Sequence, residues 1–242
     1  MPIGVILNAL AIVLGGVIGA AAGHRLSEEF KEKLNLVFGC CSMGMGISTI
    51  GLMRNMPAVI FSLILGTSLG ILIHLGQRIE RAGLAMQGLL SRFCKPAGGG
   101  NDAEKTALLV TTMVLFCTSG TGIYGAIISG MSGDHSILIA KSILDLPTSM
   151  IFACTLGAVV SVIALPQFLI FLTLFLGAKL IFPLTTPAMI DDFKACGGFI
   201  MLATGFRIIR VKQFPIADMI PAMLLVMPLS WLWVNCILPL LG

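Results

Sequence analysis

The stretch PIGVILNALAIVLGGVIGAAAG, residues 2–23, contains no Asp, Glu, Lys, Arg or His. One helical crossing of a bilayer needs about 20 consecutive apolar residues, so this stretch is long enough for one span. Two further stretches, 146–178 and 219–242, are also uncharged, and the first is long enough for two short spans that turn at Leu165-Pro166. Together they predict an all-α protein, a polytopic bundle of transmembrane helices.

The composition of the chain indicates the same class. Hydrophobic residues make up 57% and charged residues 11% of the 242 residues, whereas soluble domains carry about 25% charged residues. The first stretch follows no basic segment and precedes no clear cleavage site, so we expect a first transmembrane helix rather than a removable signal peptide. The net charge of +4 fits basic residues that flank spans, and we expect no nucleic-acid partner.

Cysteine and histidine residues form no recognisable metal or disulfide pattern. The seven cysteines include no C-x-x-C pair, and the three histidines lie far apart in the sequence. We therefore expect buried apolar cysteines, no bound metal and no cofactor. Ser119 and His135 are the one enzyme-like pair, but Ser119 lacks a G-x-S-x-G context and no H-E-x-x-H motif occurs, so we expect no enzyme.

The apolar runs and the breaks between them predict eight transmembrane helices. These cover residues 3–23, 35–53, 57–76, 106–130, 136–164, 167–184, 196–209 and 216–240. We expect a single integral membrane domain over residues 1–242. It consists of a first repeat (1–76), an interfacial helix (77–93), central helices (105–164) and a second repeat (167–242).

Basic residues indicate how the chain is oriented. If the N-terminus faces outward, most of the 15 Lys and Arg residues lie in segments that face the cytoplasm. The positive-inside rule then predicts a multi-pass protein with both termini outside. Residues 77–93 form a basic amphipathic helix, which we expect to lie in the membrane interface as an anchor, with a regulatory partner as the alternative.

Two pairs of similar segments indicate internal repeats. Glu28-Glu29-Phe30-Lys31 corresponds to Asp191-Asp192-Phe193-Lys194, and Pro57-Ala58 corresponds to Pro221-Ala222. The first three predicted helices therefore match helices 6–8, with Gly46 and Gly205 in the middle helix of each set. Because matching helices are five apart, the copies are expected to be inverted, as in many secondary transporters. A second likeness, of 41–47 to 117–123, pairs helices 2–3 with helices 4–5 in the same orientation.

Residues 119–122, Ser-Gly-Thr-Gly, interrupt the fourth predicted helix. Glycines and hydroxyl residues allow a membrane helix to unwind, and freed carbonyl groups together with Ser119 and Thr121 would then bind a solute or an ion. Gly120 and Gly122 equally fit the alternative of close helix packing. For the first predicted helix, packing is the favoured role of its regularly spaced glycines, Gly15, Gly19 and Gly23.

The first choice for a functional site is a group of charged residues near the fifth predicted helix. Asp134, Lys141 and Asp145 are spaced 7 and 4 residues apart, so they are expected to share one helical stripe, with Ser142 beside them. Ionisable residues within a membrane usually face a cavity or a partner. In the alternative, the segment lies among the lipid headgroups and the charged side chains reach into water.

Two more residues bear on this site. Pro147 is expected to interrupt the helix, so that a half-helix precedes a span. Asn8 is a lone polar residue in the first predicted helix, and we expect it to hydrogen-bond a neighbouring helix, with lining of the transport pathway as the alternative.

Three blocks of sequence resemble one known family over essentially the whole chain. They are NALAI (8–12) with Gly15-Gly16, GDHS (133–136) with KSILD (141–145), and TPAM (186–189) with Gly197-Gly198. The family is that of the YqgA/YdfK-like bacterial membrane proteins, catalogued as domain of unknown function 554. The resemblance implies the bacterial cytoplasmic (inner) membrane, but it implies no substrate and no catalytic residues.

A small secondary transporter is the function that these features favour. Inverted repeats, interrupted helices and an intramembrane ion pair are typical of carriers that move a small solute or ion by alternating access. Coupling to protons or sodium ions is expected, because no nucleotide-binding motif is present. The alternatives are a channel, with a pore through a homo-oligomer or between the repeats, and a non-transporting interaction or sensor protein that uses residues 77–93.

Overall fold

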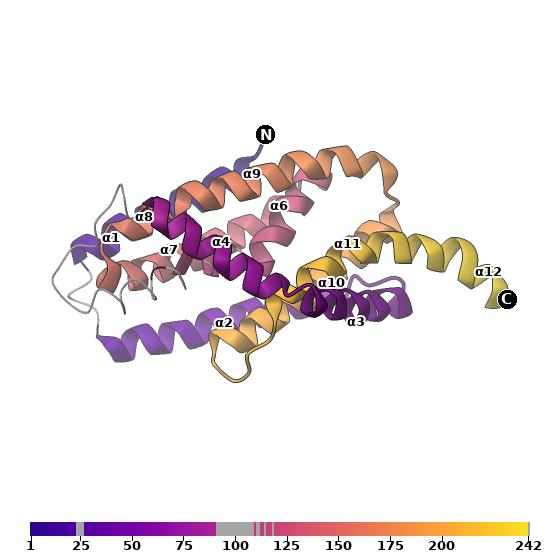
Figure 1. The fold of residues 1–242 in the computed structure, drawn as a ribbon, viewed down its shortest axis with the longest axis horizontal. Coiled ribbons are helices and arrows are strands. Elements are labelled where there is room, and N and C mark those ends of the chain that lie inside the picture. The colour runs from indigo at the N-terminus through magenta and orange to yellow at the C-terminus, as the bar shows by residue number, and fades with distance from the viewer. Residues whose placement is uncertain (23–26, 91–108, 110–111, 114, 118, 242) are drawn as a thin grey trace. The chain divides into compact units, whose positions relative to one another are not determined.

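The computed structural model describes residues 1–22, 27–90, 109, 112–113, 115–117 and 119–241. All regular structure in these residues is helical, which confirms the predicted all-α class (Figure 1). The helices are α1 (Ile3–Ala22), α2 (Glu28–Ile50), α3 (Met56–Leu72), α4 (Leu75–Leu90), α6 (Gly120–Ser132), α7 (Ser136–Leu156), α8 (Val159–Val162), α9 (Ala164–Ile181), α10 (Pro187–Ile208), α11 (Ile216–Leu232) and α12 (Leu238–Leu241), with a 3-10 turn at Phe182–Leu184 and a π-helical turn at Trp233–Ile237.

The chain folds into two compact units, each made of two separate segments. The first unit contains Met1–Asn35 and Arg78–Leu180, and the second contains Leu36–Gln77 and Ile181–Gly242. The first unit therefore includes α1, α6, α7, α8 and nearly all of α9, while the second includes α3, α10 and α11. The prediction of one integral membrane domain is not tested by this division and stays a prediction.

In the first unit, α1 packs closely against α7. A Cβ atom at Gly4 would lie 2.9 Å from Cβ of Leu138, and one at Gly19 would lie 2.7 Å from Cα of Met150. The two helices therefore run in the same direction. Their glycines permit this close approach, which confirms helix packing as the role of Gly19.

An apolar core fills the first unit where α1, α7, α8 and α9 meet. Its buried members are Ile12, Leu109, Met113, Phe116, Cys117, Ala153, Leu156, Val159, Val160, Ile163 and Ala164. Cys117 and Cys196 are buried, as expected for cysteines in apolar runs. For Cys40, Cys41 and Cys236 the expectation is wrong, because these side chains are exposed.

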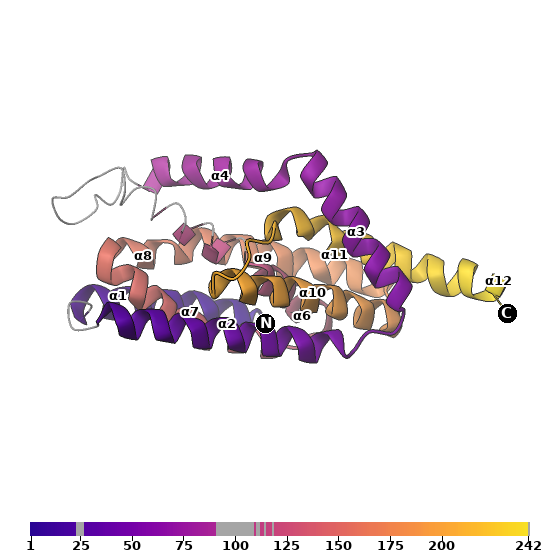
Figure 2. The ribbon, with the colours of Figure 1, turned by 90° about the horizontal axis from the view of Figure 1, so that it is seen from below.

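The turn between α7 and α9 lies earlier in the chain than predicted. α7 ends at Leu156 and is followed by Gly157, whose φ of 76° is accessible mainly to glycine. The chain then reverses through α8, as Figure 1 and Figure 2 show. The expected turn at Leu165-Pro166 is wrong, because Pro166 lies in the first turn of α9, where a missing N–H breaks no helical hydrogen bond.

In the second unit, α2 packs against α10. A Cβ atom at Gly46 would lie 2.7 Å from the carbonyl oxygen of Gly198, and one at Gly39 would lie 3.0 Å from that of Gly205. Contacts in this order require the two helices to be antiparallel. Glycine on both sides allows the two backbones to touch.

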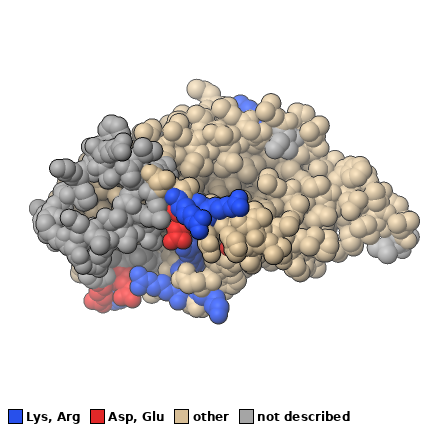
Figure 3. Space-filling view, viewed as in Figure 1, with Lys and Arg blue, Asp and Glu red and all other residues tan. Residues whose placement is uncertain are grey.

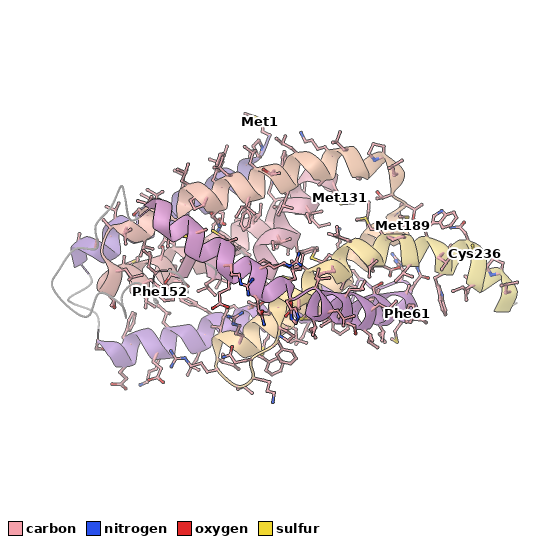
Figure 4. All side chains as sticks on the ribbon, in the orientation of Figure 1. Met1, Phe61, Met131, Phe152, Met189 and Cys236 are labelled. Atoms are coloured by element: carbon pink, nitrogen blue, oxygen red, sulfur yellow. The ribbon has the colours of Figure 1, made fainter. Side chains whose placement is uncertain are left out.

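α3 packs against α11 in the same unit. A Cβ atom at Gly66 would overlap Cα of Ala222, and one at Gly70 would lie 2.7 Å from Cα of Asp218. These helices are also antiparallel. Figure 4 shows the side chain of Phe61 on α3 projecting away from the ribbon, and its exposed fraction of 52% fits a lipid-facing position.

Four described helical segments are long and apolar enough to cross a membrane: Ile3–Ala21, Ser136–Leu156, Val159–Leu180 and Ile216–Leu240. A fifth is added if α3 and the start of α4, which are bent by 59° at their junction, count as one span. In Figure 3 the described surface on the visible face is almost entirely uncharged, with the charged residues in a few clusters. By length and apolarity, the described helices thus provide four or five candidate spans, fewer than the eight predicted.

Candidate functional site

Lys141 and Asp145 form an ion pair inside the first unit. Both lie on α7, one helical turn apart, and Nζ of Lys141 is 2.5 Å from Oδ2 of Asp145. The two residues are only 4% and 7% exposed. The expected pairing is confirmed, and the alternative, in which both side chains reach into water, is wrong because α7 turns them toward the interior of the unit.

A second helix holds the carboxylate of this pair. Asn8 on α1 is fully buried, and its Nδ2 donates a hydrogen bond of 2.8 Å to Oδ2 of Asp145. The expected hydrogen bond from Asn8 to a neighbouring helix is therefore confirmed. It links residues that are 137 positions apart in the sequence.

A third helix adds Gln167, which the sequence analysis missed. Gln167 lies on α9 and is fully buried, and its Nε2 donates a hydrogen bond to Oδ1 of Asn8. We call Asn8, Lys141, Asp145 and Gln167 the polar cluster. The sequence marks Gln167 only as the one carboxamide in the uncharged stretch 146–178, and it does not indicate which residue Gln167 binds.

The ionised carboxylate fixes the direction of every hydrogen bond in the polar cluster. A carboxylate only accepts, so Asn8 must present its NH₂ group to Asp145 and its oxygen to Gln167. Gln167 must then present its own NH₂ group to Asn8. Its Oε1, at the end of this series of hydrogen bonds, is buried and has no hydrogen-bond partner among the described residues.

Small and aromatic side chains surround the Lys141 ammonium group. Nζ lies 5.8 Å from the ring centroid of Phe116, a cation–π contact. A Cβ atom at Gly122 on α6 would overlap the ring of Phe171 and come within 2.8 Å of Cε of Lys141. Gly122, a predicted site residue, therefore provides the space that the lysine side chain occupies.

The other predicted residues near Gly122 have different surroundings. Ser119 has a non-helical backbone, with ψ of 122°, immediately before α6, so the expected helix interruption is confirmed at this residue. Gly120 and Thr121 lie inside α6, so the expected unwinding does not extend to them. Within the described part of the chain, none of these three hydrogen-bonds to the polar cluster. Thr118 lies outside the described residues.

Two expectations about α7 are wrong. Asp134 lies before the helix begins, is exposed, and accepts a 2.9 Å hydrogen bond from the backbone N–H of Ser136, so it is not part of a stripe with Lys141. Pro147 does not end a half-helix, because α7 continues through it to Leu156.

The hydroxyl group of Ser142, another predicted site residue, forms its hydrogen bond within α7. Ser142 donates a 2.7 Å hydrogen bond to the carbonyl oxygen of Leu138, and Thr148 bonds to that of Leu144 in the same way. Such bonds to the preceding turn are common for hydroxyl residues in helices. Ser142 therefore lies beside the polar cluster in sequence without a hydrogen bond to it.

A second buried carboxylate, Asp192, lies in the second unit. It accepts hydrogen bonds of 2.8 Å from the backbone N–H groups of Arg54 and Asn55, 2.8 Å from Nδ2 of Asn55, and 2.6 Å from the hydroxyl of Ser230. We call these four residues the Asp192 site. It joins α10 to the start of α3, where an anion is favoured by the helix dipole.

The described residues provide neither a metal-binding cluster nor a nucleophile elbow. Within the described ranges, no three His, Cys, Asp or Glu side chains gather closely enough to hold a metal ion. Residues 66–70, Gly-Thr-Ser-Leu-Gly, have the G-x-S-x-G spacing but lie in the middle of α3, where Ser68 is exposed and bonds to the carbonyl oxygen of Ile64. This serine lacks the sharp strand-to-helix turn of a nucleophile elbow.

Comparison with known proteins identifies relatives along the whole chain. A family model described as "Protein of unknown function (DUF554)" matches residues 3–231. "Uncharacterized protein YqgA" of Escherichia coli K12 is 46% identical over 233 residues, covering 96% of this chain and 98% of the relative. "Uncharacterized membrane protein YdfK" of Bacillus subtilis 168 is 27% identical over 228 residues, covering 92% and 93%. No solved structure matches. The resemblance seen in the sequence is confirmed, and the chain belongs to the DUF554 family.

Proposed function

We propose that this membrane protein is a small secondary transporter that moves a small solute or ion across the bacterial inner membrane. The observation that carries the proposal is the polar cluster, an ion pair and two carboxamides contributed by three apolar helices. Ionisable residues at such positions are expensive and mark substrate or ion pathways in many membrane proteins.

The energetics of the ion pair favour a functional over a structural role. Two charges lose their hydration on burial, and their attraction regains this only when all remaining hydrogen-bonding groups are satisfied. In the polar cluster Oε1 of Gln167 has no partner. Apolar side chains of similar size would therefore hold α1, α7 and α9 together at least as well.

Helix directions support eight alternating spans. α1 and α7 would be the first and fifth spans, and their contacts make them parallel. α3 and α11 would be the third and eighth spans, and their contacts make them antiparallel. Both directions are those that strict alternation requires, and the distribution of basic residues supports an arrangement with both termini outside.

The contact between α2 and α10 supports the inverted repeat. Gly39 and Gly46 have the same seven-residue spacing as Gly198 and Gly205, and each pair lies against the other in reverse order. A two-fold axis perpendicular to the helices would therefore exchange the two sides of the contact. In a membrane that axis lies in the bilayer plane, as in inverted-repeat transporters that work by alternating access.

Uptake by purified protein in liposomes tests the transporter function directly. A panel of metabolites and ions is offered with and without proton and sodium gradients, to wild type, Lys141→Ala and Lys179→Ala. Lys179 is an exposed lysine on α9 that contacts Phe175 at 4.9 Å, so it is the matched control. We expect uptake in wild type and Lys179→Ala and loss in Lys141→Ala. Undiminished uptake in Lys141→Ala would overturn the site, and no flux above empty liposomes would favour an interaction protein.

A further inference from the structure

Among the described residues, the polar cluster leaves hydrogen-bonding groups of both kinds open. An ammonium group has three N–H donors, but Lys141 makes a single hydrogen bond within the described residues, to Oδ2 of Asp145. Oδ1 of Asp145 accepts none there, since both bonds to this carboxylate use Oδ2. Oε1 of Gln167 is fully buried and unpartnered.

These open groups have a fixed order along the cluster. The hydrogen bonds run from Gln167 through Asn8 to Oδ2 of Asp145, and Lys141 binds the same oxygen. Among the described residues, open donors therefore lie at the lysine end, beside Oδ1 of Asp145, and an open acceptor lies at the glutamine end. A solute that complements this order carries an acceptor at one end and N–H donors at the other.

The net charge of the polar cluster restricts the solute further. Lys141 and Asp145 contribute one charge of each sign, and Asn8 and Gln167 contribute none. A solute with a net charge would leave one charge uncompensated in a buried site, which is strongly unfavourable. A solute that carries both charges and has no net charge avoids this cost.

We propose that the polar cluster recognises small zwitterions, and this recognition rests on the transport function proposed above. Lys141 binds the acidic group of the solute, and the carbonyl oxygen of Gln167 receives its ammonium group. Asn8 holds Asp145 and Gln167 in place through its two hydrogen bonds. Gln167 is then a specificity-determining residue rather than a packing residue.

Thermal unfolding of the purified full chain in detergent measures recognition without requiring transport. The probes are glycine, β-alanine and 4-aminobutyrate, which differ in the spacing of their charges, with acetate and methylammonium as singly charged controls at matched ionic strength. We expect at least one zwitterion to raise Tm by several degrees at saturation. Acetate and methylammonium should leave Tm unchanged, and a larger shift with either of them would overturn the proposal.

Variants that change the net charge of the polar cluster should change which probe raises Tm. Lys141→Met leaves a net negative cluster, so methylammonium should become the stabilising probe. Asp145→Asn leaves a net positive cluster, so acetate should take that place. Thr173→Ala, an exposed residue on α9 that bonds only to its own helix, should keep the wild-type response. An unchanged zwitterion preference in both charge variants would overturn the proposal.

Gln167→Met keeps the test decisive if the charge variants fail to fold. It changes no charge, and we expect the response to zwitterions to weaken by about tenfold or more, the loss that follows from about 1.4 kcal/mol. A full response in Gln167→Met would overturn the assignment of the ammonium group to this residue.

Uptake of the same probes separates this proposal from the transporter function. A zwitterion that stabilises the protein but never enters liposomes contradicts transport and supports recognition. Uptake of another solute without any zwitterion effect supports transport and overturns recognition.

Discussion

The two units each contain one buried carboxylate with hydrogen bonds to other helices, and the two differ in what those bonds leave open. Asp192 uses both oxygens and accepts four hydrogen bonds, two of them from backbone N–H groups. Within the described residues, Asp145 accepts hydrogen bonds at Oδ2 alone, and both donors are side chains, one of them a lysine.

This difference separates a structural carboxylate from a candidate site. The backbone donors of Arg54 and Asn55 are fixed by the chain that leads directly into α3, so Asp192 holds α10 and the start of α3 in one arrangement. The Lys141 ammonium is at the end of a flexible side chain, and the cluster ends in an unpartnered oxygen. Burial of an acidic residue therefore indicates function only when its partners leave hydrogen-bonding capacity unused.

The largest expected effect is on the charge balance of the polar cluster. Asp145→Asn leaves the buried Lys141 ammonium without a counter-ion, which should lower the free energy of unfolding by about 3–5 kcal/mol. Adding Lys141→Met removes that uncompensated charge, so the double variant should recover most of the loss while uptake stays absent. Reversible unfolding of the three proteins in detergent micelles measures both steps.

The Asp192 site supplies the contrast for this cycle. Asp192→Asn turns an NH₂ group toward donors that need an acceptor. Among the described residues, no Lys or Arg side chain forms an ion pair with this carboxylate, so there is no cation that a second substitution could remove. Its loss of stability should not be relieved by Lys141→Met, since the two residues belong to different units. If Lys141→Met does not restore the free energy of unfolding lost in Asp145→Asn, Asp145 behaves like Asp192, and the proposed difference between the two carboxylates is wrong.

A smaller effect is expected where the polar cluster is packed most tightly. Gly122→Ala places a methyl group against Lys141 and Phe171, so side chains must shift, at a cost of about 1–3 kcal/mol. Gly177→Ala on α9 is the control, because a Cβ atom there has no neighbour within 4 Å. It should be neutral or stabilise by up to about 1 kcal/mol. Equal Tm values for the two variants would show that Gly122 does not confine the lysine.

The parts of the site that the sequence predicted depend on local spacing. Lys141 and Asp145 are four residues apart, so one helix brings them together regardless of the rest of the fold. Asn8 stands out because a lone carboxamide in an apolar helix needs a partner. The membrane class follows from the apolar runs for the same reason, since it requires no knowledge of which helices meet.

The parts that failed depend on contacts between distant segments or on backbone angles. Gln167 reaches Asn8 across 159 residues, and nothing local marks that pairing. Pro147 was expected to break a helix, but α7 continues past it in a unit where α1 packs along the helix. The chain turns at Gly157 rather than Pro166 because the turn needs a positive φ, which proline does not have.

The smallest expected change in stability is at Gln167, and it tests the open oxygen directly. Gln167→Met removes the hydrogen bond to Asn8, worth about 1 kcal/mol, but it also removes a buried acceptor that has no partner. The two effects oppose each other, so the free energy of unfolding should change by about 1 kcal/mol or less.

Ser230→Ala in the Asp192 site removes a donor to a fully used carboxylate and should cost about 1.5–3 kcal/mol. If Gln167→Met lowers the free energy of unfolding less than Ser230→Ala does, yet abolishes uptake, Gln167 serves function rather than stability. If Gln167→Met is the costlier change, its oxygen has a partner in the folded protein, and the polar cluster is as closed as the Asp192 site.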